Sequence, residues 1–216
     1  MQGNYDEALV QHQKSLEIKL RVLGCEHANV AGDYNNIGSV YAMQGDYENA
    51  LLQHQKSLEI VIRVFGCDSA EAAMLYNNIG LVYDRQGDYA NAQRQFHKSL
   101  EIQIRVYGQK HPLVAGSYYN IGIVYRMQGR GEEALDQYTK SLEIWIRVYG
   151  QDHPRIGDTK YVMGLVYEER NEMDMARELF LECQRIRSKV HGPGHSMTVA
   201  AANAAQRASR CAEESV

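Results

Sequence analysis

The sequence predicts an all-α, right-handed superhelical solenoid of about ten helices. A repeat with a period of 42 residues runs through most of the chain. Within each repeat, apolar residues recur at spacings of three and four, which is the periodicity of one helix face. The chain has 216 residues but only 3 prolines, so few positions interrupt a helix. The apolar spacing indicates two helices in each unit, and such helix pairs bury their apolar faces against their neighbours.

The repeat divides the chain into units of equal length. The first two units agree at 26 of 42 aligned positions, and the register decays only near the C-terminal end. We therefore expect a single repeat array over residues 1–216. Its units are 3–44, 45–86, 87–128, 129–170 and a degenerate unit 171–212. The last segment of the degenerate unit is alanine-rich and polar, as expected of a C-terminal capping helix.

Each unit is interpreted as a shorter helix followed by a longer one. In the second unit the longer helix runs from Tyr47 to Phe65, with apolar residues along one face, and Gly66 ends it. Glu59 and Arg63 are spaced i to i+4 on this helix. Such a pair is expected to contribute about 0.2–0.5 kcal/mol.

Glycines recur both at the connections between helices and inside the shorter helices. Gly45 can adopt a left-handed conformation at the end of the shorter helix, and Asp46 can cap the next helix. A glycine also recurs inside each shorter helix, where it costs about 1 kcal/mol relative to alanine. We expect that cost to be offset by close approach of two helix backbones, with alanine as the small partner. The glycines are Gly38, Gly80, Gly122 and Gly164, and the alanines are Ala50, Ala92, Ala134 and Ala176.

Composition excludes several classes of function. The net charge of −4 argues against a protein that binds nucleic acid or an anionic membrane. No apolar run approaches the roughly 20 residues that span a bilayer. The first residues show no signal-peptide pattern, and no Asn-x-Ser/Thr site occurs, so we expect a cytoplasmic protein.

The histidines are interpreted as structural. No phrase typical of a serine hydrolase, a zinc peptidase or a phosphate-binding loop is present, so we expect no enzyme, cofactor or metal. His54 occupies the position of Phe96 and Tyr138 and is interpreted as a packed ring. A zinc site near His191 is the less favoured alternative. Four histidines share one connector position and are expected to serve helix entry: His27, His111, His153 and His195.

The spacing of the signature residues resembles that of the tetratricopeptide repeat family. In the first complete pair these residues are Tyr34, Ile37, Gly38, Tyr41, Ala50, His54 and Ser57. The usual unit of the family has about 34 residues. The longer unit here is similar to the kinesin-light-chain-like subclass. The resemblance implies a protein-interaction scaffold whose concave groove binds a protein or peptide partner of unknown identity.

The resemblance also implies where a peptide would bind. The first helices of successive units line the groove, and the residues there that the signature does not assign to packing are Asn35, Asn36, Asn77, Asn78, Tyr119, Asn120 and Tyr161. Asparagines at this place are expected to contact the peptide backbone, because an amide both donates and accepts hydrogen bonds. Val162 ends the row in the fourth unit. The alternative is that these amides bond only between adjacent helices.

The charge of the expected groove and the uncapped first helix bear on the kind of partner. Arg85 and Arg126 are the basic residues near the middle of the expected groove, which favours a neutral or mixed-charge peptide. The first long helix lacks its usual companion, so its apolar residues need cover. We therefore expect either a fragment of a longer array or a homo-oligomer formed through this uncapped helix. The alternative function is a self-associating structural array without a dedicated ligand.

Overall fold

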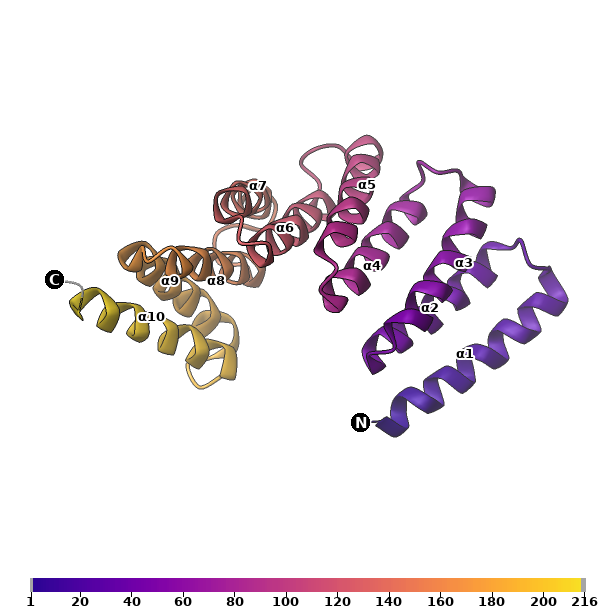
Figure 1. The fold of residues 1–216 in the computed structure, drawn as a ribbon, viewed down its shortest axis with the longest axis horizontal. Coiled ribbons are helices and arrows are strands. Elements are labelled where there is room, and N and C mark those ends of the chain that lie inside the picture. Colours follow the sequence, from indigo (N-terminus) through magenta and orange to yellow (C-terminus); the bar gives the residue numbers. More distant parts are fainter. Residues whose placement is uncertain (1, 215–216) are drawn as a thin grey trace. The chain divides into compact units, whose positions relative to one another are not determined.

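The computed structural model describes the backbone of residues 2–214 and the side chains of residues 5–212. Within this part of the chain there are ten α-helices and no strand, which confirms an all-α repeat solenoid (Figure 1). The helices are α1 Gln2–Leu23, α2 Ala28–Gln44, α3 Tyr47–Phe65, α4 Ala70–Gln86, α5 Tyr89–Tyr107, α6 Pro112–Met127, α7 Gly131–Tyr149, α8 Pro154–Glu169, α9 Met173–His191 and α10 Ser196–Glu214.

The chain divides into two compact units, and each is described by itself. One unit ends at Gln109 and holds α1 to α5, and the other begins at Lys110 and holds α6 to α10. In the first unit α2 packs on α3 and α4 packs on α5. In the second unit α6 packs on α7, and α9 packs on both α8 and α10. Each helix pair is therefore built by residues close in sequence.

The predicted glycine and aspartate joint is confirmed. Gly45 has a φ of 81°, and this left-handed conformation ends α2. Oδ1 of Asp46 accepts a hydrogen bond from the backbone N–H of Asn49 at 3.1 Å and so caps α3. Asp88 caps α5 in the same way, through Asn91 at 3.0 Å. The first turn of each helix thereby gains an acceptor that the helix itself cannot supply.

The connector histidines also cap helices, as the sequence predicts. Nδ1 of each accepts a hydrogen bond from the backbone N–H two residues later, at 3.1–3.3 Å. The four are His27, His111, His153 and His195. Before α4, where histidine is missing, Oγ of Ser69 accepts from the N–H of Ala72 at 3.2 Å. A repeated structural task therefore explains the repeated histidine.

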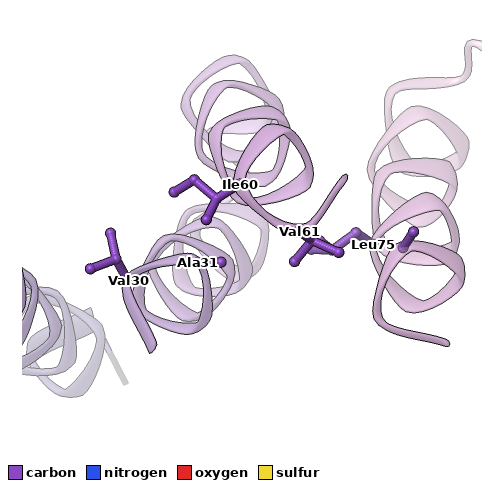
Figure 2. Packing of buried hydrophobic residues seen from close by; sticks show 6 residues of the cluster. Val30, Ala31, Ile60, Val61 and Leu75 are labelled. Atoms are coloured by element: carbon purple, nitrogen blue, oxygen red, sulfur yellow. The ribbon is translucent and has the colours of Figure 1, made fainter. Parts of the chain in front are cut away.

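The core of the first unit joins one helix pair to the next. Val30 and Ala31 of α2 pack with Ile60 and Val61 of α3, and all are at least nine-tenths buried. Figure 2 shows Val61 beside Leu75 of α4. Burying a large aliphatic side chain contributes about 1.5–3 kcal/mol. Because α3 shares its apolar face between α2 and α4, the pairs are stabilised by stacking on each other.

The helix-interior glycines make room for a ring from the next helix. A Cβ on Gly80 would lie 2.7 Å from Phe96. The corresponding distance is 3.0 Å from Gly38 to His54, and 2.6 Å from Gly164 to Phe180. The expected partners Ala50, Ala92, Ala134 and Ala176 are fully buried. At Gly38 the backbone oxygen of Ala50 is also close, at 3.1 Å. The prediction of close packing at these glycines is confirmed, and the nearest side chain is the ring from the next helix.

An exposed ion pair recurs between successive units. Arg63 contacts Glu26 at 2.9 Å rather than Glu59 of its own helix. The equivalent pairs are Arg105 with Asp68 at 2.9 Å and Lys189 with Asp152 at 2.5 Å. Partners in these pairs are 37 residues apart. The equivalent positions between the third and fourth units hold Lys110 and Arg147, which are both basic and therefore cannot form this ion pair.

Lys110→Glu is expected to complete this series by pairing with Arg147. The gain in the free energy of unfolding should be about 0.2–1 kcal/mol, because exposed ion pairs are screened by water. Urea unfolding at low and high salt measures it, and the gain should shrink at high salt. Lys110→Gln is the control, since it removes the positive charge of Lys110 without adding a partner for Arg147. Equal stability of the two variants would contradict the predicted pair.

Candidate functional site

In the first unit, the asparagines occupy neighbouring first helices. Asn35 and Asn36 lie in the middle of α2, and Asn77 and Asn78 lie at the equivalent place in α4. Nδ2 of Asn78 donates a hydrogen bond to Oδ1 of Asn35 at 3.0 Å. Asn36 is exposed, and the other three are half-buried. One amide pair thus links the two helices, while Asn36 faces solvent.

A pocket of about 170 Å³ lies beside Asn78, between α2, α3 and α4. It is lined by Ser39, Ala42, Met43, His54, Asn78, Leu81, Val82 and Arg85. Nη1 of Arg85 donates a hydrogen bond to the backbone oxygen of Ala42 at 3.2 Å, which ties the end of α4 to the end of α2. The sequence identified Asn78 but not the apolar lining, which comes from side chains on three different helices.

His54 is the buried polar residue of this pocket. Its side chain is 2% exposed, and Nδ1 has no hydrogen-bond partner. Burial lowers the pKa of His54 to about 4, so the imidazole is neutral near pH 7. It lies against Gly38 as Phe96 lies against Gly80. The interpretation of His54 as a packed ring is therefore confirmed.

In the second unit the predicted tyrosines take part in helix packing. The ring of Tyr119 in α6 packs on Tyr138 of α7, with 5.8 Å between centroids. Burial raises the pKa of Tyr119, and the charge of Asp158 raises it further. Tyr161 of α8 packs on Phe180 of α9 with 5.4 Å between centroids. Asn120 is half-buried on α6. Both tyrosines remain partly exposed, so each joins the helix packing and the surface of the first helices.

Arg187 of α9 is a polar residue that the sequence did not single out. Its guanidinium lies 4.8 Å from the ring centroid of Tyr161, and its Nη2 contacts Asp158 at 2.9 Å. Its Nη1 donates to the backbone oxygen of Met197 at 3.0 Å. The equivalent position one unit earlier is Trp145. The sequence signal that could have identified Arg187 is a charged residue at a repeat position that an apolar residue, Trp145, fills one unit earlier.

The arginines expected near the middle of the face are engaged within the protein. Arg126 contacts Glu169 at 3.2 Å, and Arg85 donates to Ala42 as described above. Lys160, also on a first helix, pairs with Glu182. These contacts neutralise or satisfy the cations.

Among the described residues, no three or more His, Cys, Asp or Glu side chains gather closely enough to hold a metal ion. The rings of His191 and His195 stack with 4.8 Å between centroids, and Cys183 is fully buried in α9. None of the described helices combines the length and apolarity that crossing a membrane requires.

Comparison with known proteins gives a family match over most of the chain. The sequence profile described as tetratricopeptide repeat matches residues 1–63, 34–105, 71–144 and 113–189. No curated protein shows significant similarity to the chain.

Several solved structures share the fold. BtubC (BKLC) from P. vanneervenii is similar with a TM-score of 0.77 and 18% identity, over 97% of this chain and 89% of that one. A putative kinesin light chain with nearly identical TPR-like repeats, from Podosopora anserina, is similar with a TM-score of 0.73 and 17% identity, over 88% of this chain and 90% of that one. The apo form of RapI gives a TM-score of 0.73 and 20% identity, over 87% of this chain and 50% of that one.

Proposed function

Because the chain belongs to the tetratricopeptide repeat family, we propose that it is a scaffold that binds an extended peptide of a partner protein along its first helices. Repeats of this family are generally scaffolds for protein interactions and are typically not enzymes. The fold is similar to that of a kinesin-light-chain repeat protein, as the period of 42 residues predicts. The peptide-binding role of the first helices is the further step that we propose.

The amide row on α2 and α4 supports this proposal. The bond between Asn78 and Asn35 holds two side-chain amides in place, and Asn36 stands exposed beside them. An exposed amide can donate to and accept from a peptide backbone, so it binds main chain without demanding one side chain. The adjacent pocket of about 170 Å³ can take a small side chain of such a peptide. A row of this kind suits an extended peptide with few charges.

The double variant Asn36→Ala and Asn78→Ala, which changes the first unit alone, is expected to lose most peptide affinity. Each lost neutral hydrogen bond costs about 0.5–1.5 kcal/mol, so the two together should weaken binding about fivefold or more. A peptide selected from a displayed random library against the unmodified protein is the probe. Fluorescence anisotropy of this peptide measures the dissociation constants, and circular dichroism checks helicity.

Two controls separate binding from structure. Asn203→Ala removes an exposed asparagine from α10 and should leave affinity unchanged. Asn35→Ala breaks the amide pair while leaving Asn36 in place, and it should lower stability more than Asn36→Ala does. Unchanged affinity of the double variant would show that the amides serve only the packing of helices. A protein that selects no peptide and binds only itself would favour the self-associating array.

A further inference from the structure

The first residue of α7 departs from a repeated pattern. The equivalent position holds Tyr5, Tyr47 and Tyr89 in earlier units and Met173 in the last one, whereas α7 begins with Gly131. The three tyrosines are half-buried. Met173 packs against the apolar cluster that includes Ala204 and Ala208 of α10. In these units a large side chain at this position contributes to packing, and in the fourth unit that side chain is missing.

A pocket lies where the missing side chain would be. Its volume is about 460 Å³, within the range of roughly 300–1,000 Å³ that is typical of ligand sites. It is formed by the end of α6, the start of α7 and the end of α8, and its lining residues are Arg126, Gly129, Gly131, Glu132, Val166, Glu169 and Arg170. A Cβ on Gly131 would meet Cγ1 of Val166 at 3.2 Å, so an apolar wall faces the place of the absent ring.

The charged groups around this pocket balance one another. Arg126 contacts Glu169 at 3.2 Å, and Arg170 contacts Glu132 at 2.5 Å and Glu172 at 2.7 Å. Within Arg126, the Nε atom is buried and has no hydrogen-bond acceptor. A charged ligand would disturb these pairs. A neutral ring with a hydroxyl group would fit the apolar wall and offer an oxygen to a guanidinium donor.

Arginine stacking on aromatic rings is already a feature of this unit. The guanidinium carbon of Arg130 lies 4.4 Å from the ring centroid of Tyr125. Arg155 lies 4.9 Å from the ring of Trp145. Planar guanidinium groups favour such faces because the ring quadrupole attracts the cation. Arg126 and Arg170 can therefore contact a ring in the pocket while keeping their carboxylate partners.

We propose that this pocket binds a tyrosine side chain of a partner polypeptide, which takes the place that the chain's own tyrosine holds in the other units. The occupant follows from Tyr5, Tyr47 and Tyr89 at the equivalent position. The pocket uses none of the asparagines of α2 and α4. It is thus a second contact for a partner, independent of the amide row.

The test uses p-cresol, which is the tyrosine side chain cut at Cβ, and the peptide acetyl-Gly-Gly-Tyr-Gly-Gly-amide. Methyl NMR signals of Val166 should shift saturably with both probes. The same peptide with leucine in place of tyrosine should bind at least fivefold more weakly. Gly131→Tyr should fill the pocket and lower the affinity for p-cresol at least tenfold. The fold should tolerate it, since tyrosine begins α3 and α5.

Controls make each outcome decisive. Gly116→Ala, in α6 where a Cβ would meet no atom within 4 Å, should bind p-cresol normally. Arg170→Met keeps the apolar stem and should weaken p-cresol severalfold, which gives a second readout if Gly131→Tyr folds poorly. The variant with Asn36→Ala and Asn78→Ala should keep p-cresol binding, so failure of the amide row and failure of this site are distinguishable. Unchanged affinity in Gly131→Tyr, or binding of p-cresol without the tyrosine peptide, would overturn the proposal.

Discussion

Gly122→Ala is expected to lower the free energy of unfolding of the second unit by about 1–3 kcal/mol, although alanine is the better helix former. The added Cβ would lie 2.5 Å from Cε1 and 2.7 Å from Cδ1 of Tyr138. The ring of Tyr138 is fully buried between α6 and α7, so it cannot move without displacing its neighbours. Overpacking therefore outweighs the propensity gain of about 1 kcal/mol.

Urea unfolding followed by tryptophan fluorescence measures this change. Trp145 is the single tryptophan, lies in α7 of the second unit and is 3% exposed, so its emission reports the unit that carries the variant. Gly116→Ala in the same helix meets no atom within 4 Å and should instead gain up to about 1 kcal/mol. Adding Tyr138→Leu to Gly122→Ala should recover part of the loss. Equal losses for the two alanine variants would contradict the steric explanation.

His54→Phe is expected to make the first unit less sensitive to acid. Burial lowers the pKa of His54 in the folded protein to about 4, from 6.5. Between these values the unfolded chain binds more protons, so stability falls as the pH drops from about 6.5 to about 4 and is constant with respect to this group outside that window. The loss from pH 7.5 to pH 4.5 should be on the order of 2–3 kcal/mol. Phenylalanine carries no such charge, and Phe96 shows that its ring fits beside a glycine.

The measurement must report the first unit and separate His54 from other titrating groups. Urea titrations at pH 7.5 and pH 4.5, followed by methyl NMR signals of Val61 and Leu75, report the core around α3. The pH-dependent loss should be smaller by about 2–3 kcal/mol in His54→Phe than in the unmodified chain. Phe96→His should acquire a loss of the same sign. An identical pH dependence in all three proteins would rule out His54 as the cause.

Contacts between successive repeats do not follow the 42-residue period itself. Asn35 bonds with Asn78, and Arg85 bonds with the oxygen of Ala42, in each case 43 residues apart rather than one repeat. Arg126 and Glu169 in the second unit have the same separation. The period predicts which residues have equivalent environments. It does not predict which atoms meet across two helices, because that depends on their axial offset and on side-chain rotamers.

The sequence by itself determined the helix pairs, their ends and the recurrence of a glycine inside each shorter helix, since apolar periodicity and capping act within a few residues of chain. It identified Asp46 and His27 at helix starts and placed Gly80 at a close contact. Only the tertiary structure decided that Phe96 fills that contact, that Arg187 lies over Tyr161, and that Gly131 opens a pocket. These features arise where side chains from different helices meet. The local sequence pattern does not specify how much space those helices leave between them.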